Sequence, residues 1–535
     1  MDSVSKVGIW IAIVILVFIV LILRSFFIEI SLSDVTLVLL DPYYQHVTKF
    51  SFYQAFLSSL FSVVFALPIS HALSYRKFKG RSLLLKLFST TLVLPVFVGI
   101  FGLLEIYGNN GLLVKLLQSF GVQLSFSVYG FNGILLAHVF FNLPYVSYLL
   151  LQELERIPSE QHKLCAYLGM SRLNKFRWIE WPRLRQQLPH VFGLVFMLCF
   201  TSFATVMALG GGPKHTTIEI AIYQAIKFDF NLKVAALLAI WQILLCGVFQ
   251  CCIQRMAKPM PISIGSNNHG HILSNQDYWV RVWDGFWIIA SCLLVFPPLL
   301  MVILSGFNSQ TINVLTDAQF LMALLFSLKI AVFSSGIALL VGISIVITSR
   351  AWRLNRKELR ADKIELIGMI ILITPSLVLS SGLFLLLRKC LGCNSFIYIT
   401  IVIVNALMAL PYVIKVLSQP MLCVAQRYQF LCLHLGIKGW KRFKIIEWKI
   451  LKKPIFYSFS ISFMLSLGDI SSFALFNSQE LQTLPFYLFQ LLSSYQMDAA
   501  AVVSLVLLFF SIIFFFLIDF LFWMNEKFFN CKCVL

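Results

Sequence analysis

The amino-acid sequence predicts an all-α integral membrane protein whose chain is a tandem duplication. Its 535 residues are 59% hydrophobic and only 12% charged, with a mean hydropathy of +0.87, whereas a soluble protein carries about a quarter charged residues. The apolar residues gather in runs as long as a membrane-spanning helix. A polar segment of the first half recurs in the second half, which indicates two equivalent units.

Apolar runs of roughly 20 residues predict about 12 transmembrane helices, six in each half. In the first half they lie near 7–27, 50–74, 83–104, 130–151, 189–209 and 234–253. In the second half they lie near 285–305, 319–348, 364–387, 396–418, 455–476 and 499–523. The long polar connection between them has no repeat partner. It predicts a first half at 1–258, a cytoplasmic linker at 259–284 and a second half at 285–535.

The distribution of basic residues predicts the orientation of the chain. Four connections are rich in Lys and Arg: 76–86, 153–190, 350–363 and 427–453. The alternate connections contain six Lys and Arg between them. By the positive-inside rule, the basic connections and both termini are expected in the cytoplasm. This topology also explains the net charge of +19, so we expect no nucleic acid partner and a membrane lipid environment.

The repeated segment is the strongest pattern in the chain. Comparing 142–182 with 409–449, a displacement of 267 residues, gives 14 identities in 41 positions. The identities include Leu-Cys, Leu-Gly, Phe and Ile-Glu-Trp, in that order. Each copy is a basic segment between two apolar runs. Two matched cytoplasmic segments in a duplicated membrane protein predict two equivalent docking sites for two copies of a soluble partner.

Each copy of the segment is expected to contain a short helix that ends at a glycine, because glycine readily adopts the left-handed conformation that ends helices. The apolar residues before the glycine are too few to span a bilayer and could insert into a cleft on a partner. The alternative is an interfacial helix that lies on the lipid surface. The predicted docking residues are Leu164, Ala166, Leu168, Gly169, Phe176, Leu431, Leu433, Leu435, Gly436 and Phe443.

A cytoplasmic loop of this form between the fourth and fifth of six spans resembles the EAA loop of the permease subunits of type I bacterial ABC importers. That pattern is Glu-Ala-Ala, three residues, Gly, and about nine residues later Ile-x-Leu-Pro. The glycine, the isoleucine and Pro182 of the first copy match the pattern. The glutamate position holds Lys163 in one copy and Phe430 in the other, and Lys449 replaces Pro182. The resemblance implies two permease halves related by pseudo-twofold symmetry.

A narrower resemblance follows the fifth span, at 197–205, Leu209-Gly210-Gly211-Gly212-Pro213 and 216–225. With Gly169-Met170 and Glu180-Trp181-Pro182, this region is similar to the fused permeases of thiamine and thiamine pyrophosphate ABC importers. The resemblance implies two copies of a separate ATPase subunit under the loops and a periplasmic thiamine-binding protein at the outer mouth. Fused ferric-iron permeases share the same plan, and a secondary transporter with two six-span halves is a further alternative.

The chain contains no Gly-x4-Gly-Lys-Ser/Thr phosphate loop, so its energy is expected to come from a partner or an ion gradient. The resemblance implies that a partner ATPase uses ATP and Mg²⁺ and that this chain binds no cofactor. We expect a transport subunit and not an enzyme, with no metal site. Cys390 and Cys393 lie on the predicted outer side, where a disulfide is permitted. Candidate residues for the translocation path or an outer gate are Asp469, Gly210, Gly211, Gly212, Thr217, Glu219 and Tyr223. Asp469 falls within an apolar run, where a carboxylate is costly, so it either faces the path or bonds to Ser471, Ser472 or a neighbouring helix.

Overall fold

The computed structural model describes residues 3–30, 35–36, 40–91, 93–121, 127–256, 278–387, 394–437, 439–476 and 482–526. All regular structure in these residues is helical, as predicted. In the first half the helices are α1 (Ser3–Glu29), α3 (Pro42–Tyr75), α4 (Arg81–Thr90), α5 (Val96–Tyr107), α6 (Leu112–Ser119), α7 (Phe131–Glu155), α8 (Ser159–Tyr167), α9 (Arg172–Lys175), the π-helix η1 (Phe176–Glu180), α10 (Trp181–Phe200), α11 (Phe203–Leu209), the 3-10 helix η2 (Pro213–His215), α12 (Ile218–Lys227) and α13 (Leu232–Met256).

The second half repeats this order. Its helices are α14 (Tyr278–Gly306), α15 (Thr311–Thr316), α16 (Ala318–Leu354), α17 (Glu358–Met369), the 3-10 helix η3 (Ile370–Ile373), α18 (Ser376–Leu387), α19 (Asn394–His434), α20 (Gly439–Arg442), the π-helix η4 (Phe443–Glu447), α21 (Trp448–Gly468), α22 (Ser471–Phe476), α23 (Leu484–Ser493) and α24 (Met497–Glu526). Residues 278–284, at the end of the predicted linker, are therefore helical, and the rest of the linker lies outside the described residues.

Nine described helices are long and apolar enough to cross a membrane, and the pair α10–α11, bent by 52°, makes a tenth. Three predicted spans, 83–104, 364–387 and 455–476, are not single helices. The first is interrupted before Pro95, between α4 and α5, the second before Pro375, and the third between Gly468 and Ser471. Proline removes a helical N–H and disfavours helix in the residue before it. Asp469 favours a new helix start because its carboxylate accepts from the N–H groups of Ser471 and Ser472, both at 3.2 Å.

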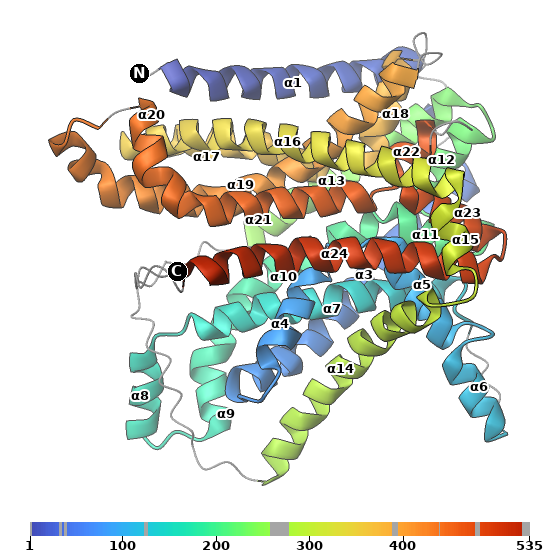
Figure 1. The fold of residues 1–535 in the computed structure, drawn as a ribbon, viewed down its shortest axis with the longest axis horizontal. Helices are drawn as coiled ribbons and strands as arrows, with labels where there is room; N and C mark the ends of the chain where they lie inside the picture. Colours follow the sequence, from blue (N-terminus) through green and yellow to red (C-terminus); the bar gives the residue numbers. More distant parts are fainter. Residues whose placement is uncertain are drawn as a thin grey trace.

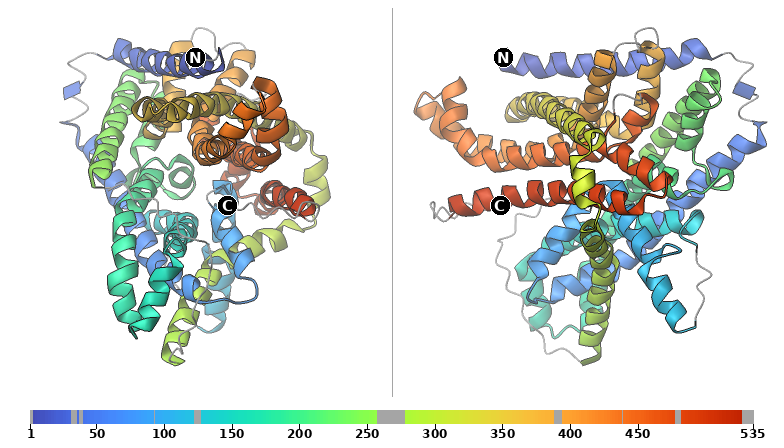
Figure 2. Two further views of the ribbon diagram at one scale, coloured as in Figure 1. Left: turned by 90° about the vertical axis from the view of Figure 1, so that its left-hand side faces the viewer. Right: turned by 45° about the vertical axis from the view of Figure 1, so that its right-hand side comes forward.

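The two halves exchange their first helices. Helix α1 packs on α16 and α18 of the second half, and α14 packs on α3 and α5 of the first half. In Figure 1, α1 runs along the second-half helices at the top, whereas α14 lies below α3 and α7. These contacts are related by pseudo-twofold symmetry, because α3 corresponds to α16 and α5 to α18. Figure 2 shows the same separation of α1 and α14 in two further views.

Matched polar contacts hold corresponding elements in both halves. Asp41 caps α3 by accepting from the N–H of Tyr43, and Asp317 caps α16 by accepting from the N–H of Gln319. Helices α12 and α23 begin against buried serines of α3 and α16, respectively. Ser51 Oγ accepts from Ile218 N at 3.0 Å, and Ser327 Oγ accepts from Leu484 N at 2.6 Å. Each serine therefore satisfies a helix N-terminal N–H that is buried away from solvent.

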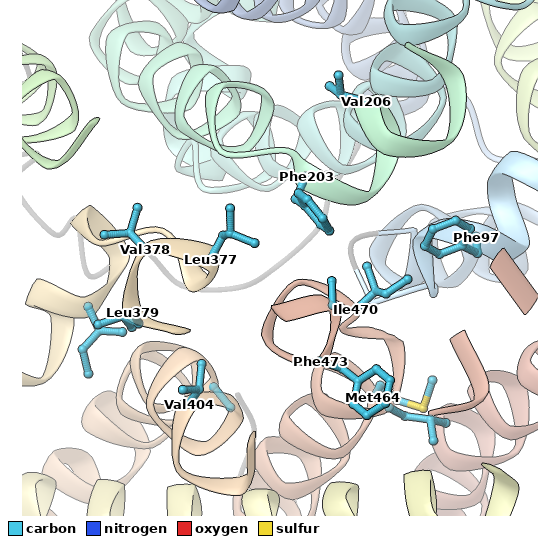
Figure 3. Packing of buried hydrophobic residues seen from close by; sticks show 14 of the residues in the cluster. Phe97, Phe203, Val206, Leu377, Val378, Leu379, Val404, Met464, Ile470 and Phe473 are labelled. Carbon is cyan, nitrogen blue, oxygen red and sulfur yellow. The ribbon is translucent and has the colours of Figure 1, made fainter. Parts of the chain in front are cut away.

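The apolar core extends across both halves. Figure 3 shows Phe97 and Phe203 of the first half close to Leu377, Ile470 and Phe473 of the second half. The ring of Phe97 also lies 5.7 Å from that of Phe489 on α23. The halves thus meet through side chains from the interrupted regions, α5 and α11 on one side and α18 and α22 on the other.

The serine contacts yield a stability prediction. Ser51→Ala leaves a buried N–H of α12 without its acceptor, which costs about 1–3 kcal/mol. We expect a correspondingly lower unfolding temperature in detergent for Ser51→Ala and for Ser327→Ala. Ser70→Ala is the matched control, because the buried Ser70 hydroxyl bonds only within its own helix, to Leu67 O. Equal effects of Ser51→Ala and Ser70→Ala would contradict the prediction.

Candidate functional site: two matched loops

The two repeated segments have the same backbone fold. The first loop is defined as 160–182. Its helix α8 ends at Tyr167 and is followed by Gly169, whose φ is +59°. Met170 N donates to Cys165 O at 3.0 Å. In the second loop, 427–449, Gly436 has a φ of +65° and Ile437 N donates to Cys432 O at 2.9 Å. The following helices α9 and η1 begin and end at positions displaced by 267 residues from those of α20 and η4.

One difference separates the loops. Helix α8 is separate from α7, because the helix is interrupted at Ile157 and Pro158. The residue that corresponds to Pro158 is Ala425, and α19 runs without a break from Asn394 to His434. Proline at the start of a helix is tolerated, but it cannot continue a preceding one. The first loop thus starts with a separate short helix, and the second with the end of a long one.

The residues predicted for docking present an apolar surface. Leu164, Leu168, Leu431 and Leu435 are each 48–67% exposed, and Ala166 and both glycines are also exposed. Phe176 is half-buried, and the side chains of Leu433 and Phe443 lie outside the described part of the chain. Further exposed apolar residues of the loops, which the sequence reasoning did not select, are Tyr167, Leu173, Trp178, Phe430 and Ile445.

Other polar and small residues of the loops orient these surfaces. Cys165 and Cys432 are each 3% exposed and face inward, whereas Leu164 and Leu431, the residues before them, are exposed. Glu160 is exposed in the first turn of α8. A hydrogen bond from its own backbone N–H, followed by one from Ser159, lowers the pKa of Glu160. The exposed surface of the first loop therefore includes one ionised carboxylate.

Both loops share one end of the molecule. Figure 1 shows α8, α9 and α20 at the left, together with the start of α1, the end of α24 and the helices α4 and α17. The segments with the highest Lys and Arg content thus lie at the same end, as the predicted topology requires. Helices α6, α15 and α23 lie at the opposite end.

Each loop is anchored by a buried glutamate that the sequence reasoning did not assign to the site. Glu180 is 2% exposed and accepts from the Tyr75 hydroxyl, and it lies 3.1 Å from His71 Nε2 and 3.7 Å from Lys175 Nζ. Its counterpart in the second loop, Glu447, is 3% exposed and pairs with Arg350 at 3.1 Å and with Arg442 at 2.9 Å. The repeat of Ile-Glu-Trp was the available sequence signal for these glutamates. Their partners His71, Tyr75 and Arg350, however, come from distant helices.

The residues predicted for the path or gate lie around the helix breaks, at the end of the molecule opposite the loops. Gly211 and Gly212 have φ values of +67° and +134°, whereas Gly210 is helical with a φ of −60°. Thr217 and Glu219 are each 1% exposed, and Tyr223 is half-buried with its ring 5.4 Å from that of Phe203.

The two predicted acidic residues come from different halves. Asp469 is half-buried, and it accepts from the Ser472 hydroxyl at 2.5 Å in addition to its backbone bonds. Ser472 Oγ also lies 2.8 Å from Asn405 Oδ1 of α19, which is an alternative acceptor for the same hydroxyl proton. Glu219 accepts from Gln242 Nε2 at 3.3 Å, and its second carboxylate oxygen has no partner among the described residues. Burial raises the pKa of the Glu219 carboxyl, the Gln242 bond opposes this, and the charge of Asp469 adds to it.

The cysteines predicted as a possible disulfide, Cys390 and Cys393, lie outside the described residues. Within the described part of the chain, no group of three or more His, Cys, Asp or Glu side chains is placed to hold a metal ion.

Comparisons with known proteins agree with this architecture. Residues 58–256 match the family model of the binding-protein-dependent transport system inner membrane component. The chain is 45% identical over 469 residues to the thiamine transport system permease protein ThiP of Escherichia coli, covering 88% of this chain and 87% of that protein. It is 41% identical to ThiP of Haemophilus influenzae, with the same coverage, and 36% identical to ThiP of Brucella abortus, with coverage of 87% and 86%. No solved structure gives a significant match.

These identities extend through both halves of the chain. The chain belongs to the family of thiamine transport system permease proteins, which are multi-pass inner membrane components of binding-protein-dependent transport systems.

Proposed function

We propose that this chain is the permease of an ABC importer that moves thiamine, or thiamine pyrophosphate, inward across the inner membrane by alternating access. The observation that supports this proposal best is the pair of matched loops on a family member whose relatives are named for thiamine transport. Both loops lie at one end of the molecule and expose leucines at corresponding positions. Two equivalent surfaces at one end fit two copies of one ATPase subunit.

The proposed cycle follows from the arrangement of the loops. ATP-driven closure of the ATPase dimer draws the loops together, and the buried glutamates Glu180 and Glu447 join each loop to a long helix of the bundle, α3 or α16. The halves then tilt about the apolar contact in Figure 3. A periplasmic thiamine-binding protein delivers substrate at the opposite end, and both termini lie in the cytoplasm. ATP and Mg²⁺ are bound by the partner.

We further propose that the acidic pair at the helix breaks lines the path. Asp469 lies half-buried between α21 and α22 and accepts from the backbone N–H groups of Ser471 and Ser472. Glu219, fully buried in α12 of the first half, lies in the same region. The Asp469 carboxylate would attract the thiazolium cation of thiamine.

Thiamine uptake tests the substrate assignment. We expect a deletion strain to lose most uptake of labelled thiamine and to grow poorly on limiting thiamine, and we expect the cloned gene to restore both. Growth on limiting iron is the control, because a fused ferric-iron permease would show its defect there. Normal thiamine uptake in the deletion strain would overturn the assignment.

A double substitution tests the docking surfaces. Leu168→Asp with Leu435→Asp places a charge where each loop would be buried against the ATPase, and a buried unpaired charge costs several kcal/mol. We expect the ATPase to be lost from the purified complex and transport to cease. Phe307→Asp with Ile312→Asp serves as a negative control for specificity, because these exposed residues lie outside the spans, just before α15 and on it, at the end opposite the loops. Both variants should reach the membrane at normal levels, and the proposal requires that only the loop variant fails to retain the ATPase.

The pH dependence of stability tests the environment of Glu219. Because burial raises its pKa in the folded state, the unfolded chain releases this proton at lower pH, so the free energy of unfolding falls as pH rises from the ordinary carboxyl range. We expect Glu219→Gln, which keeps the contact with Gln242, to flatten this slope in thermal unfolding measured in detergent. An unchanged slope in the variant would show that Glu219 is not the responsible group.

A further inference from the structure

A buried aspartate of the second half binds two arginines of the first half. Asp284, on α14, is 1% exposed. Its Oδ2 accepts from Arg76 Nε at 2.8 Å, and Arg76 Nη2 lies at the same distance. Arg172 donates from Nη2 to Oδ1 at 2.9 Å and from Nη1 to Oδ2 at 3.2 Å. The carboxylate therefore joins α14 to Arg76, which directly follows α3, and to Arg172, which begins α9 in the first loop.

The contacts continue from Arg172 to the glutamate that anchors the loop. Arg172 Nη2 lies 3.1 Å from His71 Nδ1. Because a guanidinium can only donate, His71 Nδ1 accepts this bond. The other ring nitrogen, Nε2, lies 3.1 Å from Glu180 Oε2. The guanidinium of Arg172 also lies 4.6 Å from the centre of the Tyr75 ring. A continuous series of hydrogen bonds and close polar contacts thus runs from α14 through the first loop to α3 and η1.

The second loop is held in a different way. The helix that corresponds to α14 is α1, which packs on α16 as α14 packs on α3. Residues 3–28 of α1 contain no Asp or Glu, and the position of Arg172 is occupied by Gly439. The anchor of the second loop, Glu447, pairs with Arg350 and Arg442, both of the second half. The link through Asp284 is therefore a feature of the first loop, with no sequence counterpart in the second.

The link is stiff for an electrostatic reason. A carboxylate with two guanidinium partners and little access to water is bound by charge-assisted hydrogen bonds, and removing one partner leaves its buried charge with a single guanidinium. A displacement of α9 that separated Arg172 from Asp284 would carry this cost. Moving α14 together with α9 avoids it.

We propose that Asp284 is a positioning residue that couples the first loop to the other half of the permease. A displacement of that loop by its docked partner then moves α14, so the first loop acts on both halves at once and the second on its own half. This inference rests on the proposed docking function of the loops, and it adds an asymmetry that the sequence repeat does not contain.

Two arginine variants separate coupling from simple stabilisation. Arg172→Gln breaks the link between the loop and α14 but leaves Asp284 paired with Arg76. Arg76→Gln breaks the contact between α14 and α3 but leaves Asp284 paired with Arg172. Each removes one cation from the same carboxylate. Because Arg172 also contacts His71 and Tyr75, the unfolding temperatures of both variants are compared, and a purely structural role predicts that transport falls in step with stability. Coupling through the loop predicts that Arg172→Gln alone is strongly impaired.

The experiment uses the complete complex in proteoliposomes, with the ATPase and the thiamine-loaded binding protein. For Arg172→Gln and Asp284→Asn we expect the complex to assemble, and we expect both thiamine transport and the stimulation of ATP hydrolysis by the loaded binding protein to fall about tenfold. Asp284→Glu should recover most of both. Arg76→Gln and Asp362→Asn, which removes an exposed partner of Arg353, should stay close to the unsubstituted complex.

Three results would overturn the inference. Full transport by Asp284→Asn would show that the link is not needed. Equal losses in Arg172→Gln and Arg76→Gln would assign the cluster to stability. Loss of the ATPase from Asp284→Asn would assign it to docking. Failure of the proposed function is distinguishable, because the unsubstituted complex would then show no thiamine transport or no bound ATPase.

Discussion

The exchange of first helices between the two halves is the contact on which the rest of the structure depends. Helix α1 lies on α16 and α18, and α14 lies on α3 and α5. Each half therefore lacks one covering helix unless the other half supplies it. Within a membrane there is little hydrophobic drive between helices, so close packing and polar contacts hold the halves together. The buried Asp284 supplies such a polar contact on one side, and the approach of Gly8 to Thr348 supplies close packing on the other.

Much of the fold could be predicted from the sequence, because a duplication records which elements correspond. The displacement of 267 residues in the repeated segment reappears in the bounds of α9, η1, α20 and η4. The prediction of a single helix at 83–104, at 364–387 and at 455–476 was wrong, because an apolar run does not show where a helix is interrupted. Pro95, Pro375 and Asp469 were the local signals of those breaks, and each acts through backbone hydrogen bonding and not through hydropathy.

The candidate site was predictable in part. The leucines before each glycine are exposed at corresponding positions, as expected of a docking surface. The anchoring of the loops could not be predicted, since His71, Tyr75 and Arg350 lie far from Glu180 and Glu447 in the sequence. Asp284 was placed in the predicted linker, because the charged residues around it hide the start of α14. Only the packing of α14 against α3 reveals its two arginine partners.

The single amino-acid difference at Pro158 and Ala425 gives the halves different mechanics. Helix α19 has 41 residues, so it extends about 60 Å, roughly twice the thickness of the hydrocarbon layer. In the proposed cycle, a push on the loop end of α19 travels along one continuous helix into the membrane. In the first half, the same push meets the break between α8 and α7, and force passes sideways through ionic contacts. Two identical ATPase subunits, if docked as proposed, would then act through a continuous helix on one side and through ionic contacts on the other.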